Sequence, residues 1–193
     1  MNQQTEFFGR RLMWTAVVFT LVTGGAAAQN IDKFVVSGDA AKKALTKTEI
    51  SGDTAAKIAQ VCLDFAKQHN IAVSIFVVSP SGQIVHAHRM DGQAPINIET
   101  GLMKAQSALY TRTSTHEFAN RVNNNLALQM RWAKLPIYPV SGGLPIVVDN
   151  QLIGAIGVGG SNMDEECAYA GLVAVLGPQP PLTEKEPAPP PAR

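Results

Sequence analysis

Apolar residues recur along the chain at two spacings, one typical of helices and one typical of strands. Over residues 51–66 they fall every three or four positions, the period of an amphipathic helix, and Ser51 or Asp53 is placed to cap its start. The same period predicts further helical stretches over residues 97–110, 113–132 and 164–177. The stretch over 113–132 forms one or two helices, and the three asparagines at 123–125 mark the expected break between two.

Two pairs of strands are predicted between these helices. Residues 71–79 are rich in Val, Ile and Phe, residues 83–90 alternate, and a turn at 80–82 joins them. A second hairpin is predicted where residues 144–148 and 152–158 flank the turn Asp149-Asn150. Hairpins that are separated by helices, without a strand–helix–strand crossover, are typical of an α+β fold. We therefore expect an antiparallel sheet flanked by helices.

The N-terminus differs in composition from this middle part. Arg10 and Arg11 precede an apolar run over residues 12–22, and alanines at 26–28 follow, which is the pattern of a secretory signal peptide cleaved after Ala28. The run is short for a bilayer span, although an uncleaved membrane anchor is the alternative, and the paired arginines loosely match a twin-arginine signal. We expect a periplasmic or secreted protein without a stable membrane span after cleavage.

The C-terminus is rich in proline, which lacks the amide hydrogen that helices and sheets need, so we expect a disordered tail there. The chain is thus divided into a signal peptide over 1–28, an N-terminal lead-in over 29–47, one domain over 48–177, and the tail over 178–193.

Composition narrows the classes of partner. The 193 residues carry 16 Lys and Arg against 15 Asp and Glu, so no long-range field attracts a phosphate backbone, and we expect no nucleic acid partner.

Cys62 and Cys167 are the two cysteines of the chain. In an oxidising compartment they could form one disulfide, whereas two buried thiols are the alternative, and their number does not decide between these.

Several short motifs within the domain resemble one protein family. They are Ala87 to Gly92, Lys104-Ala105, Gly142 to Ile146, Gly154 to Val158, and Asp164 to Ala168. Together, from about residue 48 to 177, they resemble the GlcG/HbpS-type haem-binding family. The resemblance implies a profilin-like or PAS-like sheet flanked by helices, assembly as dimers or larger rings, and, in some members, the binding or degradation of haem.

The resemblance and the residue chemistry together select candidate ligand-binding residues. In the family the Lys104-Ala105 pair points toward the groove between helix and sheet, where an ammonium can bind a carboxylate such as a haem propionate. Gly142 and Gly143 are expected at the rim because glycine lets a backbone approach a ligand closely, although tight turns and strand–helix packing would also explain them. Arg89 and Asp91 are either partners of an anionic ligand or an internal ion pair.

Histidines on the second predicted strand are candidate ligands of haem iron. His86 and His88 are two residues apart, so both side chains project from the same face of that strand. The alternative is a pair of exposed histidines on an open sheet face or at a subunit contact. Because no Cys-x-x-Cys-His motif occurs, any haem would be bound non-covalently.

These observations favour an exported homo-oligomer that binds haem or a similar flat, carboxylated small molecule. The alternative is an enzyme, a lyase, isomerase or hydrolase, acting on a small organic acid. In that case Lys104 and Arg89 would hold the carboxylate, and His88 or His116 would act as the general base.

Overall fold

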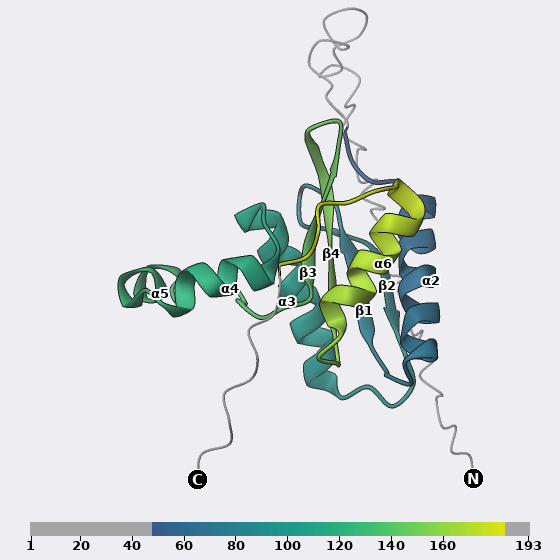
Figure 1. Cartoon of the computed structure of the whole chain (residues 1–193), viewed down its shortest axis with the longest axis horizontal. Coiled ribbons are helices and arrows are strands. Elements are labelled where there is room, and N and C mark those ends of the chain that lie inside the picture. Colours follow the sequence, from purple (N-terminus) through teal and green to yellow (C-terminus); the bar gives the residue numbers. More distant parts are fainter. Residues whose placement is uncertain (1–47, 184–193) are drawn as a thin grey trace, which may run out of the picture. The chain divides into compact units, whose positions relative to one another are not determined.

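The computed structural model describes residues 48–183 and has the α+β fold that the sequence predicts (Figure 1). The predicted signal peptide and lead-in lie outside the described residues, as does the tail from residue 184 onward. Within the described part, five helices and four strands follow in the order α2, β1, β2, α3, α4, α5, β3, β4 and α6.

The four strands form one antiparallel sheet. In sheet order they are β2 (Ile84–Arg89), β1 (Ser74–Val78), β4 (Gln151–Gly159) and β3 (Gly143–Val148). The two predicted hairpins are joined because β1 pairs with β4, with Ser74 opposite Gly159 and Val78 opposite Ala155. As a result β2 and β3 lie at opposite edges of the sheet, with two strands between them.

Helices cover both faces of this sheet. Helices α2 (Gly52–Gln68) and α6 (Asp164–Leu176) pack against one face, and α3 (Pro95–Thr111) packs against the other. Successive side chains of a strand point to opposite faces. Strand β1 therefore places Ile75 and Val77 in the core beneath α2 and α6, and Phe76 and Val78 in the core beneath α3.

The region predicted as one or two helices forms two, with the break at the asparagine run. Ser114 Oγ accepts the Glu117 N–H at 3.0 Å at the start of α4 (Thr115–Asn123), and Asn125 Oδ1 accepts the Leu128 N–H at 3.1 Å at the start of α5 (Leu126–Trp132). Figure 1 shows these two helices projecting from the sheet. We refer to residues 112–135 as the arm.

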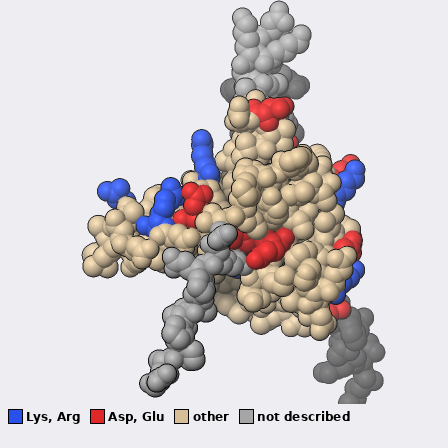
Figure 2. All heavy atoms as spheres, in the orientation of Figure 1, with Lys and Arg blue, Asp and Glu red and all other residues tan. Residues whose placement is uncertain are grey.

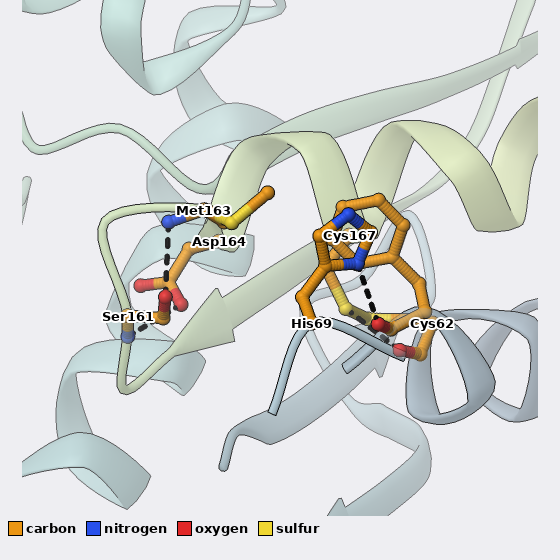
Figure 3. The surroundings of a disulfide bond; sticks show 7 residues. Cys62, His69, Ser161, Met163, Asp164 and Cys167 are labelled. Atoms are coloured by element: carbon orange, nitrogen blue, oxygen red, sulfur yellow. Dashed lines mark hydrogen bonds between the residues drawn. A yellow bond between two sulfur atoms is a disulfide. The ribbon is translucent and has the colours of Figure 1, made fainter. Parts of the chain in front are cut away.

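A disulfide joins the two helices on one face of the sheet. Cys62 of α2 and Cys167 of α6 are bonded, with their Cα atoms 4.7 Å apart, and both residues are fully buried (Figure 3). Of the two alternatives that the sequence left open, the structure has the disulfide.

The first part of the predicted tail lies against the domain. Residues 178–183 form no helix or strand, but the Tyr169 hydroxyl of α6 donates to the Gln179 carbonyl oxygen at 3.3 Å, and Leu182 packs against the core. The packed structure therefore extends beyond the expected boundary at residue 177. The expected disorder of residues 184–193 concerns a part outside the described residues.

Candidate functional site

A buried ion pair connects the two helical layers. Lys104 Nζ, from α3, donates to Asp164 Oδ2, from the first turn of α6, at 2.7 Å. The two side chains are only 6% and 3% exposed. The Ser161 N–H donates to the other carboxylate oxygen of Asp164 at 2.8 Å (Figure 3). Both oxygens of Asp164 are thus bound from within the chain.

Burial of the Asp164 carboxylate and its interactions with neighbouring donor groups act on its pKa in opposite directions. Removal of the carboxylate from water raises the pKa, while the Lys104 ammonium and the N–H groups of Ser161 and Gly160 lower it. Burial has the larger effect, so the pKa of Asp164 lies above its ordinary value. Lys104 therefore compensates only part of the free energy needed to bury this charge.

The glycines at the start of β3 approach Lys104 closely, inside the protein. A Cβ at Gly142 would lie 2.7 Å from the Cβ of Asp164, and a Cβ at Gly143 would collide with the backbone oxygen of Lys104. The Gly143 N–H donates to Thr115 Oγ1 at 2.9 Å. These contacts favour close packing as the reason for glycine here, the alternative that the sequence left open.

A second carboxylate is buried beside the first. Glu165 is 1% exposed; its Oε2 accepts the Ser141 hydroxyl at 2.6 Å, and no hydrogen bond reaches its Oε1. Met163 is the N-cap residue of α6, and no side chain caps this helix. The side chains of Asp164 and Glu165 are both buried.

The candidate histidines lie elsewhere. His86 and His88 are opposite Val77 and Ile75 on the edge strand β2, where His86 is half-buried and His88 is exposed. Their backbone partners show that the two side chains share the α2 side of the sheet, as the spacing predicted. Since Gly143 belongs to the opposite edge strand, the structure does not bring the histidines together with the glycines and Lys104.

Arg89 and Asp91 also lie away from the Lys104 pair. Arg89 ends β2 and Asp91 follows in the next turn; both are exposed. The predicted site residues thus separate into a buried group around Lys104 and an exposed group along β2.

A cleft of about 660 Å³ opens on the outer side of β3. Four segments wall it: the junction of α3 and α4, strand β3 with its following turn, helix α6, and residues 178–183. About half of the lining side chains are apolar or proline, among them Leu144, Pro145, Val147, Leu172, Pro181 and Leu182. The others are polar and include the carboxylates of Glu117 and Asp149. We refer to it as the β3–α6 cleft. Strand β3 of the predicted second hairpin therefore forms one wall of a cleft. Lys104, which was expected in the groove between helix and sheet, is buried and does not line this cleft.

Two functional groups in this cleft were missed by the sequence analysis. Arg112 follows α3 in a left-handed conformation with φ of 55°, and its exposed side chain lines the cleft. Tyr169 lines it from α6 and is the one lining residue of a type that commonly ligates haem iron. No spacing pattern marked either residue, because the cleft is assembled from segments about 20 residues apart or more in the sequence, except for α6 and the chain that follows it.

Two further observations concern metal ions and membranes. Across residues 48–183, no three His, Cys, Asp or Glu side chains come together in a way that would hold a metal ion. In that same part of the chain, no helix combines the length and the apolar character that crossing a bilayer requires.

Comparison with known proteins adds the following. The family model described as haem degrading protein HbpS-like matches residues 50–173. Protein GlcG of Escherichia coli K12 is 36% identical over 94 residues, which are 48% of this chain and 68% of that protein. A double mutant of Streptomyces reticuli HbpS is similar in structure, with a TM-score of 0.65 at 24% identity, over 73% of this chain and 94% of that one. A PduOC complex with haem gives a TM-score of 0.63 at 24% identity, over 66% of this chain and 95% of that one.

Proposed function

Because this chain belongs to the HbpS-like haem degrading protein family, we propose that it binds haem non-covalently in the β3–α6 cleft. The observation that carries the proposal is the composition of this cleft, in which apolar side chains and prolines of β3, α6 and the residues that follow α6 lie beside one arginine and one tyrosine. Binding of haem by PduOC, a structurally similar protein, supports the class of ligand.

The cleft suits a macrocycle of this kind. Its volume of about 660 Å³ lies within the usual range for small-molecule sites, and its apolar side chains and prolines could contact a flat apolar ring. The Arg112 guanidinium would hold a propionate through charge-assisted hydrogen bonds, and the Tyr169 hydroxyl would bind the iron in place of the Gln179 carbonyl. Bound haem would supply a redox-active iron, while the chain's own residues would bind the ring and limit its contact with water.

Titration of the full chain with haemin, followed by the Soret band, tests this proposal. We expect saturable binding, which Arg112→Ala weakens by about 10–100-fold, the equivalent of one hydrogen bond to a charged group. Tyr169→Phe is expected to change the spectrum of the bound haem, because it removes the proposed iron ligand.

Variants on β2 are the matched controls for this titration. His86→Ala and His88→Ala are expected to leave binding unchanged, since both lie across the sheet from the cleft. Loss of binding in these variants, with Arg112→Ala unaffected, would place haem on β2 instead. A chain that leaves the Soret band unperturbed would rule out haem as the ligand.

We also propose that the protein works outside the cytoplasm. The predicted signal peptide supports export, and so does the Cys62–Cys167 disulfide, because disulfides persist mainly in oxidising compartments. Expression in a bacterial host, followed by fractionation and mass spectrometry, should yield a periplasmic or secreted chain that begins at Gln29. A chain that retains residue 1 and stays in the cytoplasm would contradict this proposal.

A further inference from the structure

An aromatic hollow of about 290 Å³ opens between α3, α4 and α5. Three aromatic rings and two aliphatic side chains supply most of its lining: Tyr110, Phe118, Trp132, Val122 and Leu128. No residue lines both this hollow and the β3–α6 cleft, so the two are separate features of the surface. We refer to it as the arm hollow, because all but two of its lining residues belong to the arm.

The rings of the arm hollow are held in place by their own packing. Trp132 of α5 meets Phe118 of α4 edge to face, with ring centroids 5.2 Å apart, and the Arg121 guanidinium lies 5.6 Å from the centroid of the Phe118 ring. Trp132 and Leu128 are half-buried and Tyr110 is 55% exposed, so solvent reaches the hollow. A preformed hollow lined by aromatic rings is the kind of surface that binds proline-rich segments in the polyproline II conformation.

A proline-rich segment of the same chain begins close to this hollow. Thr183, the last described residue, lines the β3–α6 cleft together with Glu117 of α4. Arg121, one turn after Glu117 on α4, lines the arm hollow. The ten residues 184–193 extend over about 31 Å in the polyproline II conformation, whereas one turn of helix rises about 5.4 Å. The segment is therefore long enough to reach the arm hollow.

The sequence of this segment suits an aromatic hollow. Residues 187–191 are Pro-Ala-Pro-Pro-Pro. Proline favours the polyproline II helix, which has about three residues per turn and no internal hydrogen bonds, so Pro187 and Pro190 lie on the same side of it. Because the backbone of proline is already restricted, less conformational entropy is lost when such a segment docks.

Charge favours the arm over the rest of the domain as the docking surface. The arm carries four basic side chains and one acidic one, whereas the other described residues carry four basic and nine acidic side chains. Figure 2 shows the basic groups standing out over α4 and α5. Glu184 and Glu186 precede the proline run, with Lys185 between them. The start of the segment is thus acidic on balance and is attracted to the arm.

We propose that residues 184–193 dock in the arm hollow of their own chain as a polyproline II helix, with proline rings against Trp132 and Leu128. Because the segment is attached to the domain, its effective concentration at the hollow would be on the order of millimolar, so even a weak contact would be occupied. The docked segment would connect residues 178–183, on one wall of the β3–α6 cleft, to the arm on another wall. The inference does not depend on haem binding.

Paramagnetic broadening of nuclear magnetic resonance signals in the full chain tests this inference. Ala192→Cys supplies a single free thiol for a nitroxide label, because the two native cysteines are bonded to each other. The indole N–H signal of Trp132 and the backbone amide signal of Leu128 are expected to lose most of their intensity, which returns when ascorbate reduces the nitroxide. The amide signal of Lys57, on the exposed side of α2, should keep its intensity.

Variants of the segment and of the hollow are the controls, with the Trp132 indole signal as the readout. Replacement of all four prolines in 187–191 with serine keeps the length of the segment but removes its polyproline II preference, and should restore most of the intensity. Leu128→Ser, inside the hollow, should do the same. Leu126→Ser is the matched change on the same helix, but Leu126 is 70% exposed and lies outside the hollow, so the intensity loss should remain.

Three results would overturn the inference. The first is a labelled chain in which the Trp132 signal keeps its intensity. The second is an equal loss of intensity in the serine variant of the segment, which would mean that the tether alone brings the label near the arm. The third comes from a mixture of isotope-labelled chains without nitroxide and nitroxide-labelled chains without isotope, since broadening there would place the segment on another copy. The segment variant leaves residues 48–183 unchanged, so its result stands even where circular dichroism shows that Leu128→Ser loses helix.

Discussion

Replacement of Lys104 with methionine is expected to lower the free energy of unfolding by about 3–5 kcal/mol at neutral pH. The methionine fills a similar volume, but it leaves the Asp164 carboxylate, whose side chain is 3% exposed, without its cation. Removal of one partner of a buried pair leaves an uncompensated charge in a medium of low polarity. Urea unfolding measures the loss, and Lys57→Met on exposed α2 is the control, expected within about 0.5 kcal/mol of the native chain.

The penalty is expected to shrink as the pH falls. Burial already raises the pKa of Asp164, and Lys104 is the largest influence that lowers it, so the variant should have a still higher pKa in the folded state. The unfolded chain keeps the ordinary value of 3.8. The neutral carboxyl therefore contributes stability below that value, and this contribution is lost as the pH rises through the raised pKa. Unfolding at several values between about pH 4 and 7 follows the change.

Two results would contradict this account of the pair. One is a penalty that is the same at acid and neutral pH, which would mean that a lost packing contact, not charge, destabilises the variant. The other concerns the double variant Lys104→Met with Asp164→Leu, which we expect to recover much of the stability because no charge remains buried. A double variant as unstable as the single one would argue against an electrostatic cause.

The secondary structure could be predicted because its signals are local. The helical period over 51–66 and the turn at Asp149-Asn150 involve residues within one or two turns of each other, and both elements are found. The match to the family model over residues 50–173 confirms the resemblance that the motifs indicated. By contrast, no local signal indicates that β1 pairs with β4, and that pairing separates β2 from β3.

The site was harder to predict because its residues come together over long distances in sequence. Lys104 was expected to bind a carboxylate, and it does bind one, but that of Asp164, 60 residues away. An internal partner cannot be recognised from spacing, since any of the acidic residues in the sequence could supply it. The histidines and the glycines lie in motifs of the same family, yet strand order places them at opposite edges of the sheet. Arg112 and Tyr169 carry no motif, and only the folded cleft connects them.

The disulfide is the basis of the second large expected effect. Cys62→Ala with Cys167→Ala should lower the free energy of unfolding by about 4 kcal/mol, because the crosslink closes a long loop, between residues 105 positions apart, and so restricts the unfolded chain. Either single substitution should cost about as much as both. Dithiothreitol should lower the urea midpoint of the native chain to that of the double variant, and should leave the double variant unchanged.

The effects of the crosslink and of the ion pair are expected to be coupled. Cys167 lies one helical turn after Asp164, so the disulfide and the Lys104 pair both hold the first turns of α6 against the rest of the domain. Once the disulfide is absent, the start of α6 should loosen more easily and admit water to Asp164, which reduces the penalty of an unpaired charge. Lys104→Met should therefore cost less in the cysteine-free background than in the native one, by about 0.5–3 kcal/mol, the usual range for residues that share a network. Equal costs in the two backgrounds, measured by the same urea titrations, would show that the first turn of α6 is held by its core contacts alone.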